Sequence, residues 1–169
     1  MKNKLYIFSG LPGTGKTTLA KAIAKDMGAT YFRIDTIEQA LRDVCKINVE
    51  GEGYRLTYWI AEDNLRLGNN VVIDCVNPVE LTRKEWEGVA IQSNVEFVNI
   101  EIKCSDKREH RKRSEQREND IAGFELPKWE DIEARGYEEW NEERIEIETS
   151  GKSVEECVEE LKTEIIKLS

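Results

Sequence analysis

The feature that most constrains this chain is a glycine-rich octapeptide, Gly10-Leu-Pro-Gly-Thr-Gly-Lys-Thr17, which follows a short apolar run and precedes a segment with helical spacing. It fits the pattern G-x-x-x-x-G-K-[ST] at every position. Glycines permit the positive φ angles and close backbone approach that let successive N–H groups point at phosphate oxygens. The helix that follows adds the positive end of its dipole. The octapeptide therefore predicts a loop that binds the phosphates of a nucleotide.

Three side chains at the end of this loop carry the expected chemistry. In such loops the lysine, here Lys16, places a positive charge at the β- and γ-phosphates, and the hydroxyl at Thr17 ligates Mg²⁺. Thr18 can reach the α-phosphate. The expected cofactors are therefore ATP and Mg²⁺. The residues expected to bind the nucleotide through this loop are Gly10, Leu11, Pro12, Gly13, Thr14, Gly15, Lys16, Thr17 and Thr18.

Apolar runs alternate along the chain with stretches of helical spacing. The expected strands are 4–9, 30–34, 71–73, 95–102 and 144–148. The expected helices are 17–27, 36–45, 54–67, 81–92, 105–118, 129–140 in part, and 153–168. This alternation favours an α/β fold with about five parallel strands flanked by helices. We expect residues 1–169 to form a single domain.

Small or acidic residues directly follow the expected strands. They are Gly10, Asp35, Asp74, Ser105 and Ser150. Ligands of doubly wound sheets bind outside the carboxyl ends of the strands. We therefore expect these residues to converge on one crevice.

Asp35 is the candidate catalytic carboxylate. A kinase of a small hydroxyl compound needs a carboxylate near the acceptor oxygen, as a base or to orient it. The alternative is that Asp35 caps the helix 36–45, where Glu38 follows three residues later. Both roles can hold at once.

Asp74 closes the apolar string VVID, a pattern in which the aspartate acts on Mg²⁺ directly or through water. Asn77 and Arg83 lie just beyond it and are candidates for binding the acceptor or a phosphate. The alternatives are a turn role for Asp74 and Asn77 and a surface position for Arg83.

Residues 105–118 hold six Lys or Arg against four Asp or Glu in a chain whose net charge is −9. A basic helix on an acidic protein suggests a lid, at about 105–128, that closes over polyphosphate. Arg113 and Arg117 are four residues apart and are expected to share a helix face, from which they would clamp the transferring phosphoryl group. The alternative is a solvated helix with i,i+4 ion pairs.

Five segments resemble the small P-loop kinases grouped with AAA_33-type ATP-binding proteins. They are GLPGTGKTT, RIDTIEQALR, VVIDCVNP, REHRKRSEQR and PKWEDIEARGYEEW, and the resemblance spans residues 5–150. Relatives include adenylylsulfate kinases, gluconate kinases, polynucleotide 5′-hydroxyl kinases and zeta toxins. The resemblance implies the three-layer P-loop NTPase fold of the kinase type.

The resemblance also implies roles for single residues. It makes Asp35 the catalytic carboxylate and Asp74 part of the metal strand, and it makes Arg113 and Arg117 lid arginines. In relatives the loop after the last strand lies beside the adenine. The residues that this implies as further nucleotide contacts are Ser150 and Gly151.

One position departs from the pattern of several relatives, which carry an arginine a few residues after the catalytic aspartate to hold the acceptor. This chain has Glu38 there, and its next arginine is Arg42. Arg42 is therefore a third candidate for acceptor binding, beside Asn77 and Arg83. The departure weakens the case for a nucleic-acid 5′ end as acceptor.

These features together predict a kinase that transfers the γ-phosphoryl group of ATP·Mg²⁺ to a small hydroxyl- or phosphate-bearing acceptor. Two alternatives stay open: an ATP-dependent switch or ATPase that binds a protein partner, and a P-loop protein without transfer activity. Neither the acceptor nor the oligomeric state follows from the sequence.

Composition limits the partners and the cellular location that we expect. A net charge of −9 makes duplex nucleic acid an improbable partner. No apolar run approaches the length of a membrane span, and no secretory signal is recognisable, so we expect a cytoplasmic protein without membrane contact. The four cysteines form no CxxC pair and are expected to be reduced and mostly buried. The four tryptophans are expected mainly in the core.

Overall fold

The computed structural model describes residues 2–168. Five strands form one parallel sheet in the order β2-β3-β1-β4-β5. They are β1 (Lys4–Ser9), β2 (Thr30–Arg33), β3 (Val71–Asp74), β4 (Glu96–Lys103) and β5 (Ile145–Glu148). The helices are α1 (Lys16–Met27), α2 (Ile34–Cys45), α3 (Glu52–Arg66), α4 (Glu80–Gln92), α5 (Lys107–Gln116), α6 (Trp129–Ala134) and α7 (Val154–Lys167). The expected α/β class is confirmed.

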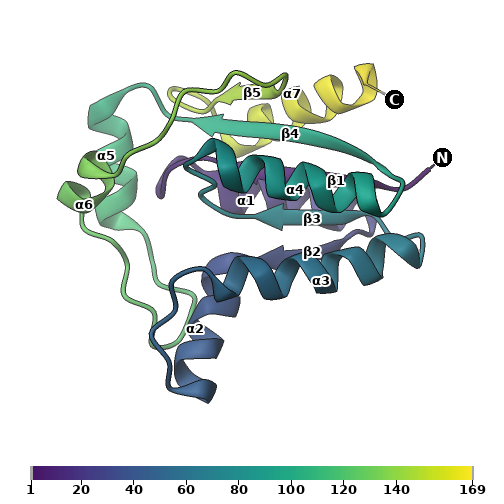
Figure 1. Cartoon of the computed structure of the whole chain (residues 1–169). Helices are drawn as coiled ribbons and strands as arrows, with labels where there is room; N and C mark the ends of the chain where they lie inside the picture. The colour runs from purple at the N-terminus through teal and green to yellow at the C-terminus, as the bar shows by residue number, and fades with distance from the viewer. Residues whose placement is uncertain (1, 169) are drawn as a thin grey trace.

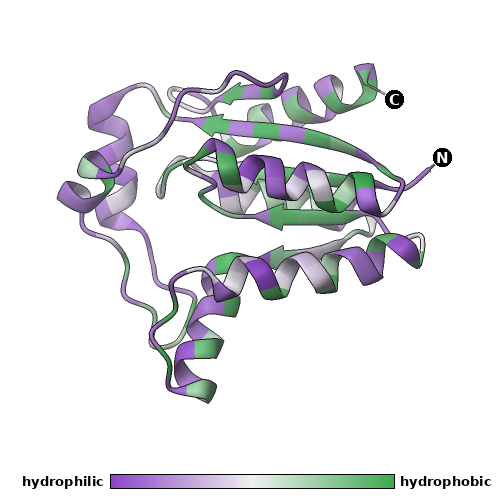
Figure 2. Ribbon diagram, in the orientation of Figure 1, coloured by the Kyte–Doolittle hydropathy of each residue, from purple (hydrophilic) through white to green (hydrophobic). Residues whose placement is uncertain are grey.

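The sheet lies between two helical layers (Figure 1). Alternating side chains of β1 serve the two cores: Tyr6 and Phe8 pack with α1 and α7, whereas Leu5 and Ile7 pack with α3 and α4. This is the period-two pattern of a strand that is buried on both faces. In Figure 2, β3 is hydrophobic along most of its length, β4 alternates between hydrophobic and hydrophilic residues, and α5 beyond the strand ends is hydrophilic.

One part of the chain lies beyond the carboxyl ends of the strands. There α5, α6 and the connection between them, residues 117–128, reach from the P-loop side of the molecule toward α2 (Figure 1). This connection is irregular, as expected for its Gly- and Pro-containing sequence. The segment predicted as a lid therefore lies over the edge of the sheet where ligands bind in this class of fold.

Asp35 does not cap a helix, so that alternative was wrong. β2 ends at Arg33 and α2 already begins at Ile34, because the Ile34 side chain is buried in the core beneath α3 and α4. Arg33 is the N-cap residue, and no side chain caps the helix. Asp35 lies in the first turn, where its charge is favourable for the helix dipole and its oxygens are free of a capping bond.

The basic helix is shorter than expected. Asp106 caps α5 by accepting hydrogen bonds from the N–H groups of Arg108 and Glu109, so the helix starts at Lys107 rather than Ser105. The chain is extended at Arg117. Arg113 and Arg117 thus do not share a helix face, although both side chains reach the same cavity described below.

Arg83 does not face a ligand, because it is fully buried. Its guanidinium donates to the carbonyl oxygens of Asn77, Pro78, Glu138 and Glu139 and lies 4.1 Å from the ring centroid of Trp140. Five backbone and ring partners from two segments therefore surround this charge. Arg83 fastens residues 137–140 to the start of α4, and its predicted role in acceptor binding was wrong.

Asn77 is also fully buried. Its side-chain amide donates to the Ser9 hydroxyl at the end of β1, and its backbone has a φ of 53°, which asparagine tolerates better than most residues. Asn77 shapes the turn after β3, and its predicted acceptor contact is likewise not supported.

Most of the aromatic and sulfur side chains lie where they were expected. Trp86 and Trp129 are buried, and Cys75, Cys104 and Cys157 are buried while Cys45 is exposed. Trp59 differs, because 72% of it is exposed on the outer face of α3, and Trp140 is only half-buried. Among residues 2–168 no helix has the length and apolar character needed to cross a membrane.

Replacing Arg83 by Ala should destabilise the protein by about 3 kcal/mol, because four carbonyl groups lose their donor and a buried cavity forms. Thermal and urea unfolding measure the effect. The neighbouring Lys84→Ala removes a half-exposed lysine and should change stability by less than about 0.5 kcal/mol. Equal effects of the two substitutions would contradict the structural role of Arg83.

Candidate active site

The loop between β1 and α1 has the backbone of a phosphate-binding loop. Gly10, Gly13 and Gly15 have φ angles of 145°, 86° and 98°, which side-chain-bearing residues rarely adopt. The N–H of Gly10 donates to the Val76 carbonyl, and Thr14 is buried with its hydroxyl on the Leu11 carbonyl. Gly10 and Thr14 therefore hold the loop in shape.

A buried ion pair lies beneath this loop. Lys16 Nζ is 2.7 Å from Asp74 Oδ1, and the side chains are 8% and 1% exposed. Burial alone would raise the pKa of Asp74, but the charge of Lys16 and hydrogen bonds from Lys16, Thr17 and Tyr31 hold this pKa below its ordinary value. Asp74 is thus an ionised carboxylate that touches the two loop side chains expected to meet phosphate and Mg²⁺.

Tyr31 completes this arrangement from the neighbouring strand. Its hydroxyl donates to Asp74 Oδ2 at 2.8 Å, on the oxygen that Lys16 does not take. Burial and the adjacent carboxylate raise the pKa of Tyr31, so the phenol stays protonated and remains a donor. The sequence analysis missed Tyr31, although its position two residues before Arg33 places both on one face of β2.

A cavity of about 330 Å³, here called the P-loop cavity, opens above the loop. Its lining residues come from the loop, from α1, from α5 and from the start of α7. They are Leu11, Pro12, Gly13, Gly15, Lys16, Thr17, Thr18, Leu19, Arg113, Arg117, Thr149, Lys152, Ser153, Val154 and Cys157. The cavity thus has a polar end at the loop and a more apolar end at α7, which suits a phosphate chain attached to a base.

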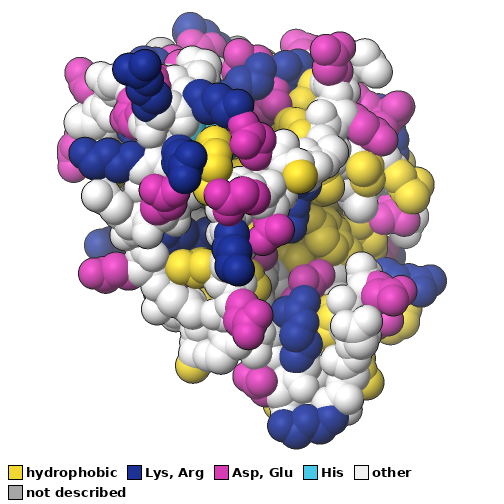
Figure 3. Space-filling model, turned by 90° about the vertical axis from the view of Figure 1, so that its left-hand side faces the viewer, with side chains coloured by type: hydrophobic (Ala, Val, Ile, Leu, Met, Phe, Trp, Pro, Cys, Tyr) yellow, Lys and Arg dark blue, Asp and Glu magenta, His cyan; other side chains and the backbone are white. Residues whose placement is uncertain are grey.

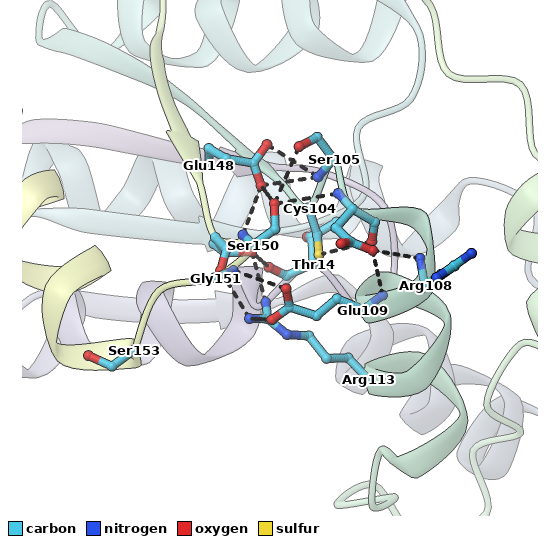
Figure 4. Close-up of polar contacts among 12 residues, drawn as sticks. Thr14, Cys104, Ser105, Arg108, Glu109, Arg113, Glu148, Ser150, Gly151 and Ser153 are labelled. Carbon is cyan, nitrogen blue, oxygen red and sulfur yellow. Dashed lines mark hydrogen bonds and ion pairs between the residues drawn. The ribbon is translucent and has the colours of Figure 1, made fainter.

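The loop after β5 does form one wall of this cavity, but through other residues than Ser150 and Gly151. The Ser150 hydroxyl donates to Glu148, and the Gly151 N–H donates to Glu109 Oε2 (Figure 4). Their polar groups are already satisfied within the protein. The wall is made by Thr149, which belongs to the loop that the resemblance places beside the adenine, and by residues 152–154, for which the sequence predicted no role in nucleotide binding.

The same network fastens α5 to this loop. Arg113 donates to the hydroxyl and the carbonyl of Thr149 at 2.9 and 3.0 Å and pairs with Glu109 (Figure 4). Thr149 in turn donates to the Thr14 carbonyl in the P-loop. Arg113 is therefore held at the cavity wall through a chain of bonds that ends on the phosphate-binding loop.

The α5 helix also rests directly on the P-loop. His110 Nε2 donates to the Pro12 carbonyl at 2.8 Å, and its ring packs edge-on against Trp129. Gly13 lies so close to α5 that an added Cβ would come within 2.1 Å of the Ser114 hydroxyl. His110 is thus a packing residue, and Gly13 is required for contact with α5 as well as for its positive φ.

A second cavity of about 510 Å³, here called the Asp35 cavity, adjoins the first. Its lining residues are Pro12, Asp35, Glu38, Gln39, Arg42, Val76, Arg117, Gly123, Phe124, Glu125, Pro127 and Arg135. Pro12 and Arg117 line both cavities. Arg117 has no hydrogen-bond or ion-pair partner among residues 2–168, so its guanidinium is available at the junction.

Asp35 and Asp74 lie on the same side of the sheet, as expected. Asp35 Oδ2 and Asp74 Oδ2 are each 4.0 Å from Arg33 Nε. Arg42 lines the Asp35 cavity and pairs with Glu38 at 3.3 Å. Burial raises the pKa of Glu38, an effect that Arg42 opposes. Of the three candidate acceptor residues, Arg42 alone reaches this cavity.

The surface around these cavities is mixed in charge. Figure 3 views the side that carries α5, α6 and the 117–128 connection, where Lys and Arg alternate with Asp and Glu around a hollow with a hydrophobic floor. Arg135, at the end of α6, lines the Asp35 cavity without an ion-pair partner within the described residues. It belongs to the segment PKWEDIEARGYEEW, but no sequence signal predicted a role for it.

A family model described as AAA_33, an AAA domain, matches residues 5–136. The chain belongs to the AAA_33 family. Among curated proteins, Lon protease 2 of Bdellovibrio bacteriovorus is 47% identical over 58 residues, which cover 34% of this chain and 6% of that protein. This AAA_33 chain thus matches only a small part of the Lon proteases it resembles.

Solved structures match the AAA_33 chain over nearly its whole length. The APS kinase CysC of Mycobacterium tuberculosis, in complex with AMPPNP and APS, has a TM-score of 0.70 at 14% identity and covers 98% of both chains. A gluconokinase from Sinorhizobium meliloti 1021 has a TM-score of 0.69 at 16% identity and covers 98% of this chain and 93% of its own. The fold is therefore that of the small P-loop kinases.

Gly13→Ala should lower ATP affinity by at least about tenfold, because the new Cβ would strain a φ of 86° and collide with Ser114. Titration calorimetry with ATP measures it. The matched control is Gly136→Ala, where a Cβ meets nothing within 4 Å and φ is not positive, and it should bind ATP like the wild type. Unchanged affinity in Gly13→Ala would mean that phosphates bind elsewhere.

Proposed function

We propose that this AAA_33 protein is a kinase that transfers the γ-phosphoryl group of ATP·Mg²⁺ to a small hydroxyl- or phosphate-bearing acceptor. The observation that carries the proposal is the junction of two cavities at Pro12 and Arg117, with the P-loop in one and Asp35 in the other. A transferase needs such a pair of adjoining sites, whereas nucleotide binding alone needs one. The gluconokinase and the APS kinase of similar fold support the same reaction class.

The P-loop side of the site would bind and neutralise phosphate. Outward N–H groups of residues 11–17 would cradle the phosphate oxygens, and Lys16 would move from Asp74 to the β- and γ-phosphates. Thr17 and Asp74 fit a Mg²⁺ site, because a hydroxyl and an ionised carboxylate already touch each other there. Bound ATP·Mg²⁺ would supply the phosphoryl group and the positive charge of the metal.

The Asp35 side would bind the acceptor. Asp35, partly exposed in its cavity, would orient the acceptor hydroxyl and take its proton. Arg42 would contact the acceptor from the same cavity, and Arg135 is a candidate that the structure adds. Arg117 would face the group in transfer from the junction, while Arg113 closes the nucleotide side.

The segment 105–128 would act as the lid of this site. Its helix rests on the P-loop through His110, and its connection walls the Asp35 cavity through Gly123 and Phe124. Closure of this segment would exclude water and bring the arginines to the phosphates. The acceptor is a small molecule under this proposal, so neither a membrane nor duplex nucleic acid is needed as a partner.

Asp35→Asn should keep ATP affinity within about twofold of the wild type and lower acceptor-dependent ADP release by at least about a hundredfold, because a proton acceptor is lost and the phosphate cradle is not. A panel of hydroxy acids, sugars, nucleosides and amino alcohols, scored by ADP release, supplies the acceptor. Full activity of Asp35→Asn would remove the carboxylate from the mechanism.

Lys16→Ala is the companion variant, and its effect should differ in kind. It removes the charge at the phosphates, so ATP affinity itself should fall. If no compound of the panel raises ADP release while the wild type binds ATP and hydrolyses it slowly, the kinase proposal fails and a nucleotide-dependent switch takes its place.

A further inference from the structure

Arg33 is a buried guanidinium that faces three carboxylates from three different parts of the chain. It lies at the end of β2 with a side chain 5% exposed. Its Nε is 4.0 Å from Asp35 Oδ2 in α2 and 4.0 Å from Asp74 Oδ2 at the end of β3. Its NH1 is 2.8 and 2.9 Å from the two oxygens of Asp120 in the 117–128 connection.

The two sides of this guanidinium are satisfied unequally. On the Asp120 side it makes close charged hydrogen bonds, and Lys21 of α1 adds a second cation at 3.0 Å from Asp120. On the other side its Nε–H is buried and has no hydrogen-bond partner, although two carboxylate oxygens lie 4.0 Å away. A buried donor without an acceptor is unfavourable, and charged acceptors attract it most strongly.

This imbalance means that something keeps Arg33 from closing onto Asp35 or Asp74. A shift of about 1 Å would turn either 4.0 Å contact into a charged hydrogen bond. Either bond would draw a carboxylate away from its place beside the cavities. The contacts that oppose such a shift are the two bonds to Asp120, because they hold the far end of the guanidinium.

We propose that Arg33 is a positioning residue, held by Asp120 so that its charge keeps Asp35 and Asp74 close together without binding either. Docking of the 117–128 connection against Arg33 then positions the two carboxylates for the roles proposed above. The proposal rests on the proposed function for what those carboxylates do. It adds that a residue of the connection, outside both cavity walls, controls them through Arg33.

Loss of Asp120 should therefore weaken the metal-dependent part of nucleotide binding. In Asp120→Asn the guanidinium is released and binds Asp74 or Asp35. The gain in ATP affinity on adding Mg²⁺, measured as the ratio of Kd in EDTA to Kd in Mg²⁺, should fall about tenfold, the value of one charged hydrogen bond. Asp120 is half exposed, so this variant is expected to fold.

Three further substitutions separate positioning from simple loosening of the connection. Lys21→Gln removes the other cation on Asp120 but leaves the Arg33 contact. Asp120→Asn and Lys21→Gln should therefore both raise trypsin cleavage after Arg117, but only Lys21→Gln should keep the Mg²⁺ gain of the wild type. In an Arg33→Gln background, Asp120→Asn should cause no further loss, because the guanidinium to be released is absent. Arg33→Lys, which keeps the charge, should retain more of the Mg²⁺ gain than Arg33→Gln.

Three results would overturn the proposal: an unchanged Mg²⁺ gain in Asp120→Asn, an equal loss in Lys21→Gln, or additive losses from Arg33→Gln and Asp120→Asn. None of these measurements uses an acceptor. Failure of the acceptor panel would therefore remove the kinase proposal while these measurements still decide the role of Arg33, and the two failures stay distinguishable.

Discussion

The ion pair between Lys16 and Asp74 joins the two sequence motifs on which this site depends. It is buried, so its charges are costly to separate or to leave unpaired, and that cost fixes the start of α1 against the end of β3. Thr17 and Tyr31 bond to the same carboxylate from two further elements. The phosphate loop, the metal-type aspartate and the neighbouring strand are therefore one rigid unit, on which the more distant α5 and the 117–128 connection are placed.

That placement relies on polar contacts rather than on a large apolar interface. One attachment runs from Arg113 and Glu109 to Thr149 and Gly151. Another runs from His110 to the Pro12 carbonyl. Polar contacts at the edge of a core can be exchanged for bonds to a ligand at little net cost in free energy. This property suits the lid proposed for residues 105–128.

The sequence predicted the fold class because strand and helix signals are local and repeat along the chain, and it predicted the P-loop because a phosphate cradle needs glycine at fixed spacing. It placed Asp74 and Asp35 correctly on the same side of the sheet, because both follow strands whose carboxyl ends meet, while their roles in metal binding and catalysis stay predictions. It failed with Arg83 and Asn77, since position after a strand does not say whether a side chain turns outward or into a buried turn. Asp120 could not be found at all, because an irregular connection without a periodic signal brings it to its partners Arg33 and Lys21. Arg135 was not singled out either, because nothing in the sequence shows that α6 ends at the Asp35 cavity.

Pro12 and Arg117 lie in a wall that the two cavities share. A ligand in one cavity would set the positions of these two residues, which also line the other cavity. Under the proposed function, the nucleotide and the acceptor would both meet this shared wall, so their affinities would be coupled and each would change the other by the same factor. The affinity of such a protein for its second ligand would depend on whether the first ligand is already bound.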